Sequence, residues 1–192
     1  RPTFSCYHVI DYDTITGRPR AFDTAQGYSR ESAWARGQSW ALYGFTMMYR
    51  ESGKEDYLTA ARNVAFFLMN HPRMPQDKVP YWDYDAPDIP NAKRDASSAA
   101  IMASALIELS QVNNMFPVEN DGYLKFAEAQ LRSLSSPQYL AKKGENHHFT
   151  LMHSVGSLPG KSEVDVPLSY ADYYYVEALL RLKKVLKEQP SK

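Results

Sequence analysis

The chain reads Gln26-Gly27-Tyr28-Ser29-Arg30-Glu31-Ser32-Ala33-Trp34-Ala35-Arg36-Gly37-Gln38-Ser39-Trp40 at the point where its first long apolar helix is expected to begin. Arg36 and Trp40 stand four residues apart, so they share one face of a helix. A guanidinium beside an indole at the mouth of a helix suits a ligand that is both flat-faced and anionic. Both residue types are also common at the edge of a core, so the spacing alone leaves a structural role equally open.

Hydrophobic periodicity outward from this stretch predicts alternating inner and outer helices. The first and third predicted helices are apolar around most of their circumference, which predicts burial, and the fifth begins with aromatic residues expected to be buried and ends with lysines. The second and fourth have a polar face. The five predicted helices cover residues 32–51, 54–70, 95–112, 119–134 and 167–188. Such alternation is typical of a solenoid or of a closed α/α toroid. Five helices cannot close a toroid, so we expect this chain to be part of a larger ring.

Local signals mark the ends of these helices and the segments between them. Gly53 is placed to cap the first helix, and Asp95 to start the third. Residues 1–29 are expected to be non-helical, with a strand-like segment at 7–12 and a turn around Gly17. Residues 147–165 predict a short hairpin.

Composition excludes several classes of protein. The 192 residues fit one domain, spanning 1–192, and the 22 basic residues balance the 22 acidic ones. A net charge of zero argues against a nucleic-acid partner or an anionic membrane surface, and no apolar run approaches a membrane span. Fourteen tyrosines are compatible with carbohydrate binding, because their rings can stack on sugars.

Neither end of the chain nor its cysteine content fixes the compartment. Cys6 is the only cysteine, so no intrachain disulfide can form. No signal peptide is visible, but the chain starts at Arg1 rather than at a methionine, which fits a trimmed or partial product.

Four motifs follow one another along nearly the whole chain. They read Gln26-Gly27-Tyr28-Ser29 with Ser32-x-Trp34-Ala35-Arg36-Gly37-Gln38-x-Trp40, then Val79-Pro80-Tyr81-Trp82-Asp83-Tyr84-Asp85, Arg94-Asp95-x-Ser97-x-Ala99, and Asp172-Tyr173-Tyr174-x-x-Glu177-Ala178-Leu179. In this order they resemble the C-terminal half of the unsaturated glucuronyl hydrolases, glycoside hydrolase family eighty-eight. The resemblance implies an all-α fold, an (α/α)6 toroid-type barrel with short β segments in its loops, of which this chain supplies roughly the C-terminal half.

The resemblance also implies a reaction. The family removes Δ4,5-unsaturated uronic acids from oligosaccharides, without a cofactor or a metal ion. An aspartate protonates the vinyl-ether double bond, water adds at C5, and the resulting hemiketal collapses to release the remaining sugar. The family's catalytic aspartates lie in its N-terminal half and have no counterpart in this chain. We therefore expect no catalytic residue here, an inactive isolated chain, and the N-terminal half of the same protein as its partner.

By the same resemblance, five residues would hold the unsaturated sugar. Arg36 would bind its carboxylate or a nearby hydroxyl, and Trp34 and Trp40 would shape its pocket, one of them by stacking. His8 and Gln26 would donate or accept hydrogen bonds to that sugar or to the catalytic water.

Further residues are assigned to the leaving sugar or to the scaffold. His153 and the loop from Ser157 to Lys161 would lie near the leaving sugar, where related enzymes sense sulfation. Asp83 and Asp85 are interpreted as structural carboxylates that cap loops.

Three alternatives remain at this stage. The related unsaturated rhamnogalacturonyl hydrolases share the fold, although Arg36-Gly37-Gln38 with Trp40 fits the glucuronyl type better. A non-catalytic carbohydrate-binding or structural helical module is the alternative outside enzymes. His147 and His148 could suggest a metal, but no third ligand stands at a suitable spacing, so we expect no metal site. A bacterial periplasm and a cytoplasm remain equally open as compartments.

Overall fold

Five α-helices form the body of the fold in the computed structural model, which describes residues 1–112 and 117–188. The helices are α1 (Ala35–Ser52), α2 (Glu55–Met69), α3 (Ala96–Ser110), α4 (Pro117–Leu134) and α5 (Ser169–Glu188). Two antiparallel hairpins accompany them, β1 (Val9–Tyr12) with β2 (Pro19–Asp23) and β3 (Ser154–Ser157) with β4 (Ser162–Val166). A short 3₁₀ turn covers Asn146–His148. None of the described helices has the length and apolar composition that crossing a membrane requires.

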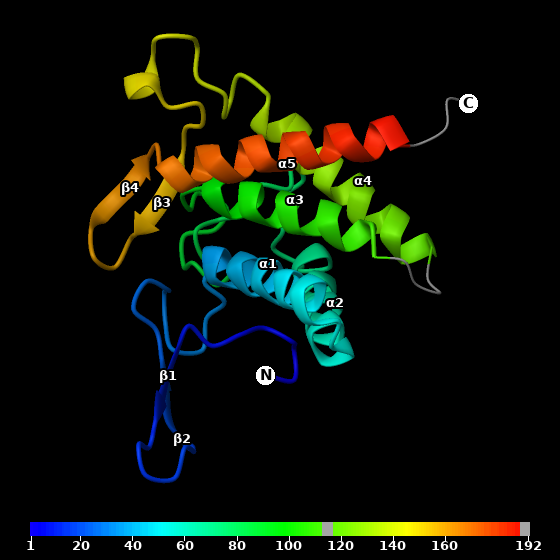
Figure 1. Cartoon of the computed structure of the whole chain (residues 1–192). Coiled ribbons are helices and arrows are strands. Elements are labelled where there is room, and N and C mark those ends of the chain that lie inside the picture. The colour runs from blue at the N-terminus through cyan, green and yellow to red at the C-terminus, as the bar shows by residue number, and fades with distance from the viewer. Residues whose placement is uncertain (113–116, 189–192) are drawn as a thin grey trace.

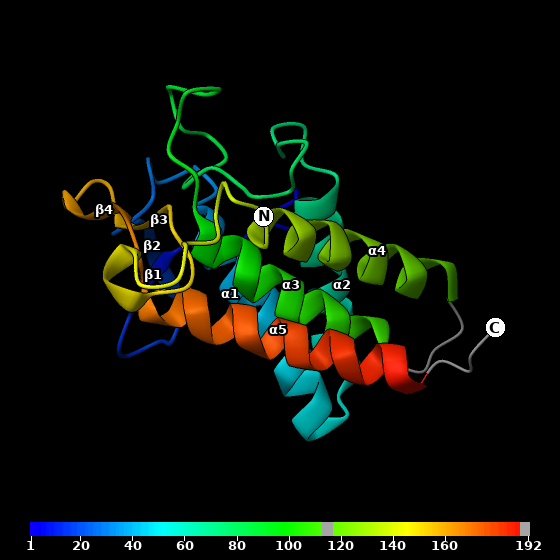
Figure 2. The ribbon, with the colours of Figure 1, turned by 90° about the horizontal axis from the view of Figure 1, so that it is seen from above.

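The helices are arranged in two layers. α1, α3 and α5 run side by side in the same direction, and both hairpins lie at the end where these helices begin (Figure 1). α2 packs on α1 and α4 packs on α3, and a second view places α3 between α4 and α5 (Figure 2). The alternation of inner and outer helices predicted from the sequence is therefore confirmed.

α3 occupies the centre of the core. Fourteen of its 15 residues are buried, and most of them are alanine, serine or a branched aliphatic residue, so neighbouring helices can approach it closely. As predicted, Asp95 caps its N-terminus by accepting a hydrogen bond from the backbone N–H of Ser97 at 3.1 Å.

The predictions that α1 would be buried on all sides and that the aromatic start of α5 would be buried are wrong for this chain. Met48 of α1 is 38% exposed, and Tyr173 and Leu180 of α5 are 61% and 62% exposed. Among the described residues, α3 has an inner helix on each side, α1 and α5. Each of those two helices has α3 as its only inner neighbour there. Their outer sides, which the sequence marked as apolar, are consequently left open to solvent.

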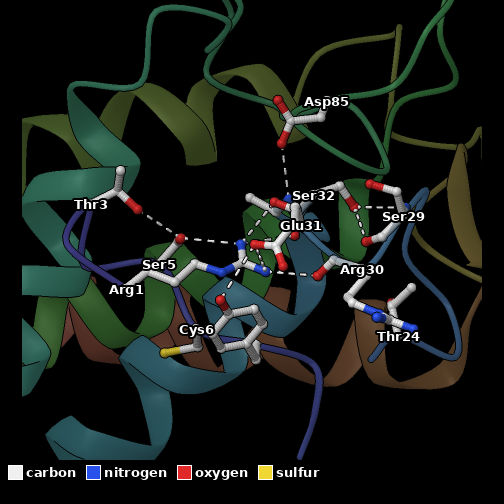
Figure 3. Close-up of polar contacts among 12 residues, drawn as sticks. Arg1, Thr3, Ser5, Cys6, Thr24, Ser29, Arg30, Glu31, Ser32 and Asp85 are labelled. Atoms are coloured by element: carbon white, nitrogen blue, oxygen red, sulfur yellow. Dashed lines mark hydrogen bonds and ion pairs between the residues drawn. The ribbon is translucent and has the colours of Figure 1, made fainter. Parts of the chain in front are cut away.

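The first residues of the chain are fastened to the segment that precedes α1. Figure 3 shows the guanidinium of Arg1 donating to three successive backbone carbonyls, those of residues 30–32, at 2.9–3.1 Å. Gln38 extends this link, because its side-chain amide donates to the carbonyl of Cys6 and accepts from its N–H. The carboxylate of Asp85 accepts from the N–H of Ala33 at 3.0 Å. These ties explain why α1 begins at residue 35 and not at the predicted residue 32.

Two glycines of α1 provide a test of how tightly its first turn is packed. A Cβ on Gly37 would lie 2.6 Å from Cε3 of Trp34, whereas a Cβ on Gly44 would meet nothing within 4 Å. Gly44→Ala should raise the free energy of unfolding by about 0.5–1 kcal/mol, because alanine loses less backbone entropy in a helix. Gly37→Ala should lower it by about 1–3 kcal/mol, because the indole must move. Urea denaturation of the two variants measures both changes, and equal stabilisation would contradict the packing of Trp34 on Gly37.

Candidate functional site

Arg36 lies in the first turn of α1 and is only 3% exposed. Its guanidinium donates to the carboxylate of Asp95 at 2.9 Å, to the carbonyl of Val155, and to the carbonyl of Gly156 at 2.5 Å. It therefore joins α1, the N-cap of α3 and strand β3. Three of its five N–H groups are used in this way, and the other two have no acceptor among the described residues.

Aromatic rings surround the guanidinium. The Cζ atom of Arg36 lies 4.7 Å from the ring centroid of Trp34 and 5.4 Å from that of Tyr170. Trp34 is buried in a small cluster with Trp82, and Trp40 is half-buried and meets Tyr170 at a centroid distance of 6.5 Å. These rings offer flat apolar surfaces beside a cation. The rings that meet Arg36 are those of Trp34 and Tyr170, whereas the spacing predicts Trp40.

His8 is held as a neutral imidazole. Its Nδ1 accepts hydrogen bonds from the backbone N–H groups of Ala25 and Gln26 at 3.2 and 3.4 Å, which assigns the ring proton to Nε2. Burial, together with the positive charge of Arg36, lowers the pKa of His8. The His8 ring packs on Trp34 with centroids 4.2 Å apart. At neutral pH His8 therefore presents an Nε2–H donor that has no acceptor among the described residues.

Gly156 connects Gln26 to Arg36. Its carbonyl accepts from Nε2 of Gln26 at 2.9 Å as well as from Arg36. The structure thus brings His8, Gln26, Trp34 and Arg36 into direct contact with one another or with Gly156, and Trp40 joins them through Tyr170. Ligand contact by any of these residues stays a prediction.

The residues assigned to the leaving sugar lie on the β3–β4 hairpin and beside it. His153 is half-exposed, and its Nδ1 pairs with Asp165 at 2.7 Å, while Lys93 reaches the same carboxylate at 2.8 Å. Ser157 accepts a hydrogen bond from the N–H of Gly160 within the turn. Lys161 is exposed at this turn, and its side chain makes no hydrogen bond or ion pair in the described part of the chain. The structure therefore places Ser157 and Lys161 at the turn of the hairpin and His153 at its other end, with no hydrogen bond or ion pair joining these three side chains.

Asp83 and Asp85 hold the loop that leads into α1, which is the role predicted for them. Asp83 is fully buried and accepts from the N–H of Tyr28, the hydroxyl of Ser32 and the N–H of Asp85 at 2.7–2.9 Å. Burial raises the pKa of Asp83, and the three donated hydrogen bonds oppose that rise. A carboxyl group enclosed in this way is not placed to protonate a sugar.

Three residues of the site escaped prediction. Asp95 was expected only as a helix cap, but its second oxygen pairs with Arg36, which lies 59 positions earlier in the chain. Gly156 and Tyr170 carried no signal at all, because their roles depend on contacts with distant segments. No group of three His, Cys, Asp or Glu side chains within the described ranges could hold a metal ion.

Comparisons with known proteins agree along the whole chain. An unsaturated glucuronyl hydrolase from Formosa agariphila is 47% identical over 186 residues, which is 97% of this chain and 45% of that protein. The crystal structure of an unsaturated glucuronyl hydrolase specific for heparin superimposes with a TM-score of 0.93 at 50% identity, over 100% of this chain and 51% of that one. No protein-family model matches the chain.

A third relative was solved with a ligand. The structure of a mutant unsaturated glucuronyl hydrolase from Streptococcus agalactiae, complexed with dGlcA-GalNAc6S, matches with a TM-score of 0.80 at 34% identity, over 94% of this chain and 47% of that one.

The parallel inner helices, their outer partners and the two hairpins at one end define about half of an (α/α)6 toroid, as the sequence predicted. The chain spans about half the length of the relatives that it matches. Over its whole length it is similar, in sequence and in structure, to unsaturated glucuronyl hydrolases.

The buried ion pair of the site can be tested by removing one charge. Asp95→Asn should lower the free energy of unfolding by about 3–5 kcal/mol, because Arg36 would stay buried without its counter-ion. The control is Asp121→Asn, which removes a carboxylate from an exposed pair with Lys125 and should change stability by less than about 0.5 kcal/mol. Urea denaturation provides both values. A small effect of Asp95→Asn would show that the pair carries little of the stability of this region.

The neutral state of His8 predicts how stability depends on pH. Because its pKa is lowered in the folded protein, the unfolded chain binds the proton more readily. Its contribution to stability should be complete above a pH of about 6.5, the ordinary histidine pKa, and should be lost as the pH falls toward the folded pKa, by at most about 1.4 kcal/mol per pH unit. Burial also lowers the pKa of His71, which adds to this fall. Urea denaturation between neutral and mildly acidic pH should therefore show a shallower dependence for His8→Gln than for the wild type. An unchanged slope would contradict the neutral assignment.

Proposed function

We propose that this chain is about one half of a hydrolase that removes a Δ4,5-unsaturated uronic acid from the end of an oligosaccharide. The observation that carries the proposal is the match to unsaturated glucuronyl hydrolases over the entire chain, in sequence and in structure together. The reaction is a hydration. A proton is added to the vinyl-ether double bond, water adds at C5, and the hemiketal opens to release the remaining sugar.

The residues around Gly156 supply groups that suit the unsaturated sugar. Its carboxylate is an anionic, planar acceptor, and Arg36 retains two N–H donors that have no acceptor among the described residues. The Nε2–H of His8 is a further donor. The rings of Trp34 and Trp40 offer faces for the flattened sugar ring, whose double bond makes it more planar than an ordinary pyranose.

The proton donor is proposed to come from outside this chain. Three carboxylates close to the site are already engaged in holding the structure. Asp95 is buried in its pair with Arg36. Asp83 is enclosed by three hydrogen-bond donors. Asp165 is engaged by Lys93 and His153. The chain would then bind and orient the sugar while the other half of the protein contributes the acid.

The partner is accordingly proposed to be the other half of the same protein, the N-terminal one. The exposed outer side of α5 supports this, because it carries large apolar side chains that a finished surface seldom displays together. They are Tyr173, Val176, Leu179, Leu180 and Leu186. In relatives of twice this length, a second set of helices is available to cover such a side.

The substrate is proposed to be an unsaturated disaccharide of a glycosaminoglycan. The Streptococcus agalactiae relative was solved with dGlcA-GalNAc6S, and the relative matched at 50% identity is described as specific for heparin. Both names point to an unsaturated glucuronic acid joined to an amino sugar.

The full-length protein that carries this chain should abolish the ultraviolet absorbance of the Δ4,5 double bond in such disaccharides, and this chain alone should not. Gln26→Ala should lower kcat/KM by about tenfold, the cost of one hydrogen bond in a binding site. Gln138→Ala, which changes an exposed amide, is the matched control. If the absorbance of these disaccharides persists while an unsaturated rhamnogalacturonan fragment is cleaved, the protein is an unsaturated rhamnogalacturonyl hydrolase and the proposed substrate is wrong.

A further inference from the structure

Glu163 lies directly across the hairpin from Gly156, the glycine whose carbonyl is held by Arg36 and Gln26. A Cβ on Gly156 would stand 2.7 Å from the Cβ of Glu163 and closer still to its carboxylate. Only a glycine therefore leaves room for this side chain. Glu163 itself has a φ of +54°, a left-handed conformation that residues other than glycine seldom adopt.

The carboxylate of Glu163 has no partner in the described part of the chain. It is exposed, and it forms no hydrogen bond or ion pair there. Asp165, two positions later on the same strand, is by contrast neutralised by Lys93 and His153. The hairpin thus carries one compensated acidic group and one uncompensated acidic group.

The location of this charge connects it to the proposed site. The side chain of Glu163 lies against Gly156, and the carbonyl of Gly156 accepts a hydrogen bond from Arg36. The ring of Tyr170 meets the same guanidinium, with its centroid 5.4 Å from Cζ of Arg36. Along the strand Glu163 precedes Asp165, and it follows the turn that carries Lys161. It therefore contacts the glycine that Arg36 and Gln26 hold, and it stands on the same hairpin as the residues proposed for the leaving sugar.

We propose that Glu163 is a specificity-determining residue that disfavours a sulfate group on the sugar next to the unsaturated uronate. This inference rests on the proposed function. A carboxylate and a sulfate separated by a few ångströms at a protein surface repel each other, and a neutral hydroxyl at the same position does not. Lys161, two positions before Glu163 and also exposed, is the cation on this hairpin that would attract a sulfate.

The test compares two substrates, the unsaturated chondroitin disaccharide with and without a sulfate on its amino sugar, in the full-length protein. The measured quantity is the ratio of kcat/KM for the unsulfated substrate to that for the sulfated one. Glu163→Gln should lower this ratio by about fivefold to tenfold, and Glu163→Lys should lower it further. Glu188→Gln removes an exposed carboxylate from the far end of α5 and should leave the ratio within about twofold of the wild type.

The two proposals fail in distinguishable ways. If the wild type cleaves both disaccharides and neither Glu163 variant changes the ratio, the role of Glu163 is overturned while the proposed function stands. If the wild type cleaves neither disaccharide, the proposed function fails, and the same ratio is then taken from dissociation constants measured by isothermal titration calorimetry. In that case a ratio unchanged by Glu163→Lys, or no binding of either disaccharide, overturns the inference as well.

Discussion

The buried ion pair between Arg36 and Asp95 is the constraint on which the rest of this region depends. Moving two charges out of water is costly, and the attraction between them repays that cost only when further hydrogen bonds complete the geometry. Here the carbonyls of Val155 and Gly156 and the N–H of Ser97 supply those bonds. The first turns of α1 and α3 and the β3–β4 hairpin are thereby fixed at one point.

This constraint also sets the electrostatics of the site. α1, α3 and α5 all begin at the end where the hairpins lie, so the positive ends of three helix dipoles face the same region. Asp95 offsets the charge of Arg36, and two of the guanidinium's donors still have no acceptor among the described residues. A site of this kind favours an anion in front of the guanidinium. Burial, together with the positive charge of Arg36, lowers the pKa of His8 and keeps its ring neutral.

Features that depend on sequence neighbours could be predicted, and features that depend on distant contacts could not. The cap by Asp95, the left-handed Gly53 after α1 and the turn around Gly17 each depend on a few adjacent residues. Arg36 contacts the carboxylate of Asp95, the carbonyl of Gly156 and the ring of Tyr170. These contacts join segments that only the fold brings together. The exposure of α1 and α5 was missed for a related reason, since their apolar outer sides indicate a neighbour without saying where it lies in the sequence.

The proposed function explains two features together: the exposed outer sides of α1 and α5, and the structural roles of three carboxylates near the site. An inner helix of a toroid needs a neighbour on each side, and α1 and α5 find only α3 among the described residues. The reaction needs a proton donor, and three carboxylates near the site, those of Asp83, Asp95 and Asp165, are committed to holding the structure together. A missing half-ring would supply both at once, because α1 and α5 lie on opposite sides of α3 and each could pack against a further inner helix. The two halves would therefore have different roles. A buried, paired cation such as Arg36 can bind an anion, but it cannot supply the proton that the double bond requires.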